Sequence, residues 1–195
     1  MEMQASRLLQ VSQQQAWDAL NNPEVLKACV PGCDKLELVE ENKYAVGMAL
    51  KIGPVSAKFA GKIVLSDINP PHSYMLGFDG QGGVAGFGKG SAKVHLRPQP
   101  AGGCELNYSV QAQVGGKVAQ LGQRLIDGAA KSMAEDFFKR FDTELQRMYP
   151  SSFAIDSIAT GGNPVSAGDH NGFKIPLWAW LAGATVLAVV FWLLK

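Results

Sequence analysis

Polar and apolar positions over the first 149 residues predict a run of strands framed by helices. Ser12 and Gln15 form a capping-box signature for a short helix, which follows an edge strand predicted at residues 3–11. Asn22-Pro23 starts a second short helix over residues 24–29, because proline suits the first helical turn. The chain therefore opens with a strand and a helical pair.

From residue 44 onwards apolar residues alternate with polar or small ones, which is the period of a half-buried strand. Two strands, at residues 44–52 and 55–65, flank a turn at Gly53-Pro54. Further strands are predicted at residues 74–78, 84–96 and 104–114. Successive strands with short Gly- or Pro-containing connections predict an antiparallel meander.

A long helix is predicted from just after Gly115-Gly116, because apolar residues then recur every three or four positions. This apolar stripe must pack on the concave face of the meander, the only large apolar surface available. The predicted fold is α+β, with an antiparallel curved sheet wrapped around a long C-terminal helix. The stripe consists of Val118, Leu121, Leu125, Ala129, Met133, Phe137, Phe141, Leu145 and Met148.

The space between sheet and helix is the candidate ligand site. Small residues, among them Gly88 and Gly90, occupy one face of the strand that ends at residue 96. Facing small residues either let two backbones approach closely or leave a void. Large side chains such as Met48 and Phe59 would hold the elements apart, so we expect an apolar cavity. Its expected lining is Val46, Met48, Leu50, Phe59, Phe78, Gly88, Gly90, Tyr108, Leu121 and Leu125.

Catalytic and metal-binding patterns are sparse, and we expect no enzyme activity and no covalently bound cofactor. His72 or Tyr108 acting as an acid or base in the cavity would make the protein a cyclase-like enzyme, which stays an alternative. The three cysteines lack a second pair at ligand spacing, so they predict neither a disulfide framework nor a metal site. A net charge of +1, with the lysines dispersed, does not fit a nucleic-acid-binding surface.

The segment 175–195 determines the predicted location. Its only charged residue is the final lysine, and twenty residues of helix rise about 30 Å, the thickness of the hydrocarbon core of a bilayer. Trp178, Trp180 and Trp192 stand near the two ends, where aromatic rings meet lipid headgroups. We therefore predict a single-pass C-terminal transmembrane helix that contacts membrane lipid.

The segment 150–174 separates this anchor from the folded domain predicted at residues 1–149. It is rich in Gly, Ser, Pro and Asn, a composition that predicts a flexible linker. The first residues lack the basic start and apolar run of a secretory signal. The domain is therefore expected on the cytoplasmic face of the inner (cell) membrane.

Five segments of the predicted domain carry a family resemblance: Ala28–Cys33, Gly53–Val55, Ala85–Gly90, Ala112–Gly122 and Arg124–Gly128. They resemble the CoxG family, the G subunits of carbon monoxide dehydrogenase, which belongs to the START/SRPBCC helix-grip superfamily. The match covers essentially the whole predicted domain.

This resemblance implies a helix-grip fold that holds an apolar ligand between sheet and helix. It also implies an accessory of molybdenum-containing carbon monoxide dehydrogenase, or of a related molybdenum hydroxylase, that recruits the enzyme to the membrane and handles the respiratory quinone. We therefore expect an isoprenoid quinone as the carried ligand. The loop of Val30, Pro31 and Gly32, rigidified by its proline, is expected to form part of the docking surface for the partner. A purely structural recruiter without a ligand is the other alternative.

Overall fold

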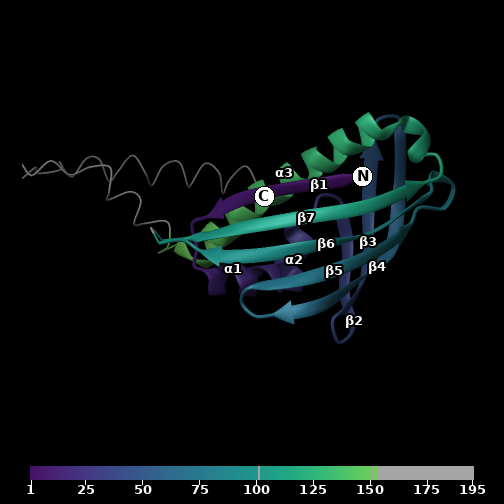
Figure 1. The fold of residues 1–195 in the computed structure, drawn as a ribbon. Helices are drawn as coiled ribbons and strands as arrows, with labels where there is room; N and C mark the ends of the chain where they lie inside the picture. The colour runs from purple at the N-terminus through teal and green to yellow at the C-terminus, as the bar shows by residue number, and fades with distance from the viewer. Residues whose placement is uncertain (101, 151, 153–195) are drawn as a thin grey trace, which may run out of the picture. The chain divides into compact units, whose positions relative to one another are not determined.

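The computed structural model describes residues 1–100, 102–150 and 152. Seven strands form one sheet, with two short helices after the first strand and one long helix at the end (Figure 1). In chain order the elements are β1 (Glu2–Leu9), α1 (Gln13–Leu20), α2 (Pro23–Cys29), β2 (Cys33–Glu40), β3 (Lys43–Ile52), β4 (Val55–Asn69), β5 (Ser73–Gln81), the 3-10 turn η1 (Gly83–Ala85), β6 (Phe87–Pro98), β7 (Cys104–Gly115), the 3-10 turn η2 (Ala119–Leu121) and α3 (Gln123–Met148).

Every strand pairs antiparallel with its neighbour, in the order β1-β7-β6-β5-β4-β3-β2. Strands β3 to β7 form the predicted meander, β2 extends it by pairing with β3, and β1 joins the other edge by pairing with β7. Figure 1 shows this curved sheet bending around α3. The predicted sheet wrapped around a C-terminal helix is confirmed, and the arrangement is a helix grip.

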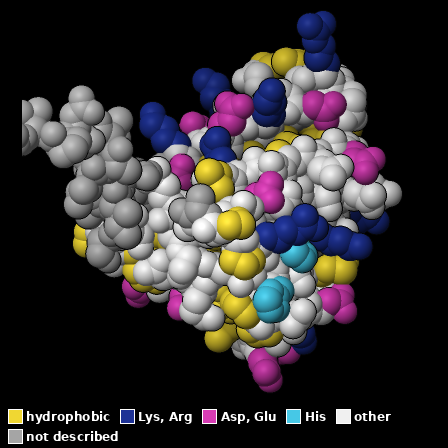
Figure 2. All heavy atoms as spheres, turned by 60° about the vertical axis from the view of Figure 1, so that its left-hand side comes forward, with side chains coloured by type: hydrophobic (Ala, Val, Ile, Leu, Met, Phe, Trp, Pro, Cys, Tyr) yellow, Lys and Arg dark blue, Asp and Glu magenta, His cyan; other side chains and the backbone are white. Residues whose placement is uncertain are grey.

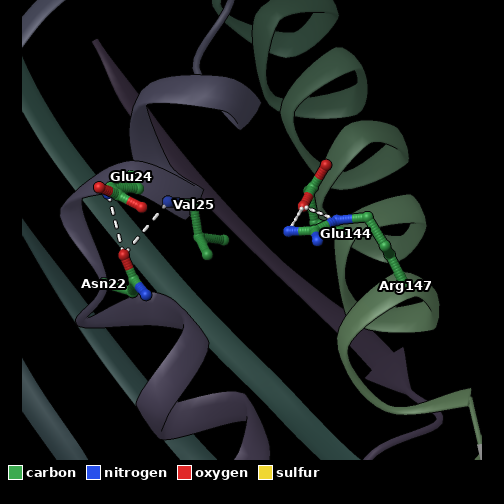
Figure 3. A network of polar contacts seen from close by, with 5 residues as sticks. All are labelled: Asn22, Glu24, Val25, Glu144 and Arg147. Carbon is green, nitrogen blue, oxygen red and sulfur yellow. Dashed lines mark hydrogen bonds and ion pairs between the residues drawn. The ribbon is translucent and has the colours of Figure 1, made fainter.

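The two short helices begin where the sequence predicts. The Ser12 hydroxyl accepts from the Gln15 N–H at 3.2 Å, and the Ser12 N–H donates to Gln15 Oε1 at 2.9 Å, which completes the capping box. At the start of α2, Asn22 Oδ1 accepts from the backbone N–H groups of Glu24 and Val25, at 2.9 and 3.4 Å (Figure 3). These caps satisfy amide groups that the first helical turn leaves without partners.

The main core lies around the C-terminal half of α3. Phe141 and Leu145 are 0% and 1% exposed, and they pack with Leu9, Leu96 and Leu106 of the sheet. Trp17, Leu20 and Val25 of the short helices join the same cluster. A second, smaller cluster joins Ile126 of α3 to Ala85 and Val118. The inward-facing side chains of β3, β4 and β5 between these clusters are only half-buried, with Tyr74 as the exception.

The main differences from the prediction concern β2, β6 and α3. No strand was predicted at Cys33–Glu40, but β2 lies there, an edge strand whose charged residues mask its alternation. β6 begins at Phe87 rather than at residue 84, because η1 precedes it. α3 begins at Gln123 rather than just after Gly116, because Gly116 and Gly122 adopt positive φ values of +82° and +85°. The chain between them forms a loop that contains η2.

The predicted anchor, with Trp178, Trp180 and Trp192, lies outside the described residues, as does nearly all of the predicted linker at 150–174. Within the described part of the chain, no helix combines the length and apolar character needed to cross a membrane.

Candidate functional site

An apolar cavity lies between the concave face of the sheet and the helices. Its first part, here called the α2 lobe, has a volume of about 340 Å³ and is bounded by α2, α3 and the inner face of the sheet. None of the residues that line it is charged. The wall includes Met3, Leu26, Val30, Leu36, Tyr44, Val46, Met48, Ile63, Leu65, Tyr74, Leu76, Tyr108, Ala134 and Phe138.

The second part, here called the glycine lobe, has a volume of about 310 Å³ and is lined by residues of β3 to β7 with Val118 and Ile126. It adjoins the α2 lobe, because Val46, Met48 and Ile63 line both. Each volume lies in the range of about 300–1,000 Å³ that is typical of small-molecule sites in proteins. An elongated apolar ligand is the kind of molecule that fits two adjoining lobes.

A row of glycines opens the glycine lobe. The register of the sheet places Gly61 on β4, Gly80 on β5 and Gly88 on β6 directly beside one another. Val46 on β3 and Val114 on β7 are the next residues on either side of this row. A Cβ atom added to Gly88 would meet no atom within 4 Å, and at Gly80 the nearest atom would lie at 3.8 Å. At Gly61, by contrast, a Cβ would lie 2.2 Å from the Asp79 carbonyl oxygen, so this glycine reflects close packing of the backbone. At Gly80 and Gly88 the missing side chains leave space beside the lobe, so there the structure has a void.

The structure brings most of the predicted lining residues together. Val46 and Met48 line both lobes, and Tyr108 lines the α2 lobe. The remaining predicted residues on this wall all border the glycine lobe: Leu50, Phe59, Phe78 and Gly88.

Three predicted residues lie elsewhere. Gly90 provides no space, because a Cβ there would lie 2.1 Å from the Gln111 carbonyl oxygen and 2.8 Å from the Phe78 ring. Leu125 is 51% exposed, and its neighbour Ile126 faces inward instead. Leu121 belongs to η2 and borders neither lobe. Leu121 lies outside α3 because the helix starts late, whereas Leu125 is helical but lies sixteen residues before Phe141, which places it roughly 160° around the helix axis from that buried side chain.

Sequence reasoning missed other residues of the wall. Gly61 and Gly80 occur on separate strands, and only the cross-strand register aligns them with Gly88. Tyr74 is 6% exposed on the inner face of β5, next to Leu76 of the same face. The alternation of residues 74–78 already marked Tyr74 as inward-facing, so this residue was within reach of the sequence.

The predicted docking loop forms part of the cavity wall. Val30 lines the α2 lobe, and the Ala49 N–H donates to the Gly32 carbonyl at 2.8 Å, which holds the loop against β3. Gly32 has a φ of +73°, and a Cβ there would lie 2.2 Å from the Ala49 carbonyl oxygen. Pro31, between them, is half-buried. A partner that contacts this loop would therefore lie directly outside the α2 lobe.

Exposed apolar side chains lie at the other end of the cavity. Phe87 lines the glycine lobe and is 38% exposed, and Val84 in η1 is 85% exposed. η1 is joined to the chain before α3 by a hydrogen bond from the Val118 N–H to the Ala85 carbonyl at 3.0 Å. This segment leads to the exposed Leu125, so apolar residues surround this end of the glycine lobe.

A groove of about 510 Å³, lined by both charged and apolar residues, separates β1 from α3. The Arg7 guanidinium lies 5.2 Å from the centre of the Phe138 ring, and the Tyr108 ring lies 5.4 Å from the same centre. Burial raises the pKa of Asp142 on α3, and Arg7 partly opposes this effect. Tyr108 lines both this groove and the α2 lobe, so it stands between them.

The two acid–base candidates occupy different environments. His72 is exposed, lies 3.0 Å from the Gln13 amide nitrogen through Nδ1, and borders neither lobe. The histidine side chains visible in Figure 2 are at the surface. Tyr108 is on the cavity wall, where burial raises the pKa of its phenol. Its hydroxyl is therefore protonated at neutral pH, able to donate a hydrogen bond.

The three cysteines are free thiols. Cys29 and Cys104 are buried, and burial raises the pKa of Cys29 to about 11. Burial also raises the pKa of Cys33, whose thiol donates to the Lys35 carbonyl at 3.3 Å. Among the described residues, no group of three side chains has the types and placement of a metal site.

Solved structures share this fold. A conserved protein from Geobacillus kaustophilus has 35% sequence identity and a TM-score of 0.72, over 75% of this chain and 96% of that protein. A protein from Thermus thermophilus has 14% identity and a TM-score of 0.57, over 76% and 99%. The ZhuI aromatase/cyclase from Streptomyces sp. R1128 has 9% identity and a TM-score of 0.54, over 75% and 94%, a likeness of fold alone.

Comparison with curated proteins gave no significant match. The family model of CoxG, the G subunit of carbon monoxide dehydrogenase, matches residues 8–146. This range includes every residue that lines the two lobes except Met3. The helix grip, its apolar cavity and this match agree with the resemblance of the sequence segments, and the chain belongs to the CoxG family of carbon monoxide dehydrogenase subunits.

Proposed function

We propose that this CoxG-family protein is a carrier that holds an isoprenoid quinone in its cavity and exchanges it between a membrane and carbon monoxide dehydrogenase. The observation that carries the proposal is the cavity itself, two adjoining apolar lobes with Gly80 and Gly88 at positions where side chains would reduce the space. A structural recruiter without a ligand has no need of such a hollow, which costs packing energy.

The chemistry of a quinone suits this hollow. Each methylene group of an isoprenoid tail gains about 0.8 kcal/mol on leaving water for an apolar wall. The interior of a bilayer offers the tail nearly the same gain, so transfer from lipid to cavity is close to neutral and reversible. A protein that loads and releases a membrane quinone requires this balance.

The family associates the protein with carbon monoxide dehydrogenase. The partner in this proposal is that molybdenum-containing enzyme or a related molybdenum hydroxylase. The predicted anchor at 175–195 would hold the domain beside the cytoplasmic face of the inner membrane. Exposed Val84, Phe87 and Leu125 at the end of the glycine lobe support contact with lipid, and the exposed Lys117 and Arg124 nearby complement anionic headgroups.

Lipids bound to the full-length chain test the carrier function. The chain, purified in mild detergent from cells that make quinone, is expected to carry an isoprenoid quinone enriched over the bulk lipid of the same preparation. Mass spectrometry of an organic extract measures this enrichment. Gly88→Phe, purified in parallel, corrects for quinone held in the detergent micelle. A wild-type preparation in which no quinone is enriched over the bulk lipid would contradict the carrier function and leave the structural recruiter.

Membrane recruitment has a separate test in cells that also produce the carbon monoxide dehydrogenase. The full chain is expected in the membrane fraction together with the enzyme, and a chain without residues 173–195 is expected in the soluble fraction. Recovery of the full chain in the soluble fraction without detergent would contradict the anchor.

The same fractionation tests docking at the loop of Val30, Pro31 and Gly32. Charge at Val30 would disturb the cavity and a side chain at Gly32 would strike Ala49, so the exposed Ala28 of α2 is the cleaner position. Ala28→Glu is expected to leave the protein in the membrane but release the enzyme, whereas Ala28→Ser releases nothing. Retention of the enzyme by Ala28→Glu would argue against this docking surface.

A further inference from the structure

A buried hydroxyl group lies on the wall of the α2 lobe. Tyr74 is 6% exposed, and its ring packs edge-on against Trp17 with 5.6 Å between ring centres. Its hydroxyl makes no hydrogen bond to any residue that the structure describes. Buried hydroxyl groups in proteins almost always have a hydrogen-bond partner. The missing partner of Tyr74 therefore requires an explanation.

The hydroxyl is not sealed inside the protein. Among the described residues, the one enclosed polar side-chain atom without a partner is Asn107 Nδ2, which is on a different part of the sheet. Tyr74 instead is one of the residues that line the α2 lobe. A molecule in this lobe is in reach of the hydroxyl.

The surroundings make Tyr74 a donor to a neutral acceptor. Burial, and secondarily the phenol of Tyr44, raise the pKa of Tyr74 far above its usual range, so it keeps its proton. The other side chains on this wall with nitrogen or oxygen atoms are Asn21, Tyr44 and Tyr108, and the Asn21 amide already donates to the Trp17 carbonyl at 2.9 Å. No charged residue lines the lobe, so a charged ligand group would have no counter-ion.

We propose that the Tyr74 hydroxyl donates a hydrogen bond to a carbonyl oxygen of the bound ligand and thereby fixes its orientation. The polar head lies in the α2 lobe beneath α1 and α2, and the apolar remainder extends into the glycine lobe. This assignment rests on the proposed carrier function and adds the residue that recognises the carbonyl group and the direction in which the ligand lies in the cavity. It also places the head behind the Val30–Gly32 loop, where the partner is proposed to dock.

Two probes and one substitution test this assignment. The probes are a decyl-substituted 1,4-naphthoquinone and the decyl-substituted naphthalene of nearly the same shape, which lacks the carbonyl groups. Calorimetric titration of the full-length chain in detergent measures both affinities. Tyr74→Phe removes only the hydroxyl and keeps the ring against Trp17, so the variant is expected to melt close to the wild-type temperature.

Tyr74→Phe is expected to bind the naphthoquinone about tenfold more weakly, the usual effect of one lost neutral hydrogen bond, and the naphthalene as tightly as the wild type does. Tyr44→Phe, the matched control on the same wall, is expected to change neither affinity by more than about twofold. An equal loss of affinity for both probes in Tyr74→Phe would show that Tyr74 has only a packing role. No loss of affinity for either probe would show that water satisfies the hydroxyl. Either result overturns the assignment of Tyr74 and leaves the carrier function standing. If the wild-type chain binds neither probe, the carrier function fails and the assignment fails with it.

Discussion

Gly88→Phe is expected to abolish ligand binding while the chain stays folded. The position points into the glycine lobe, and an added Cβ meets no atom within 4 Å, so the phenyl ring has room where the ligand would lie. Displacing four or five methylene groups of a ligand costs about 3–4 kcal/mol, which is a few hundred-fold in affinity. Overpacking costs at most about 1–3 kcal/mol of stability. Titration with the decyl naphthoquinone and thermal unfolding measure the two effects.

Two other glycine substitutions distinguish the effect of filling the lobe from the effect of destabilising the fold. Gly88→Ala adds one methyl group to the open space and is expected to change both affinity and stability little. Gly90→Ala places a Cβ 2.1 Å from the Gln111 carbonyl oxygen, so it is expected to destabilise the β6–β7 pairing. Wild-type affinity in Gly88→Phe would show that the ligand site is not in the glycine lobe.

Phe141→Ala is expected to lower the free energy of unfolding by about 3–5 kcal/mol, the usual cost of removing a fully buried aromatic ring. Phe141 is 0% exposed and stacks on Phe137, with 5.6 Å between ring centres. It holds the C-terminal half of α3 in the main core and borders neither lobe of the cavity. Urea unfolding followed by circular dichroism measures the change.

Leu125→Ala is the matched control on the same helix. Its side chain is 51% exposed, so truncating it to alanine should lower the free energy of unfolding by no more than about 0.5 kcal/mol. A loss at Leu125 as large as that at Phe141 would mean that the apolar stripe predicted from the sequence, rather than the one in the structure, faces the sheet.

Local signals made much of the fold predictable. The capping box of Ser12 and Gln15 and the Asn22-Pro23 start encode the two helices within a few residues each, so their positions followed from the sequence. Strict alternation placed Val46, Met48 and Leu50 on one face of β3, and all three line the cavity. The prediction for the second half of α3 was also correct, because Phe141 and Leu145 face the core as the helical period predicts.

The rest depended on geometry that no local pattern encodes. Leu121 falls in the loop before α3, because positive φ values at Gly116 and Gly122 delay the start of the helix. Gly88 and Gly90 have the same parity on β6, and they differ because the Gln111 carbonyl and the Phe78 ring crowd only Gly90. Such a difference arises from atoms of the neighbouring strands, which a single segment cannot reveal.

The glycine row also determines where the sheet bends most easily. Pairs of side chains across neighbouring strands stiffen a sheet, and Gly61, Gly80 and Gly88 contribute none over three adjacent strands. Glycine has in addition the widest backbone freedom of any residue. The curvature along this line can therefore change with little loss of contact, whereas the α2 lobe is braced by the core around Trp17 and Phe138. The cavity thus has one stiff end and one compliant end, an arrangement that can discriminate between the polar heads of its ligands and accept tails of different bulk.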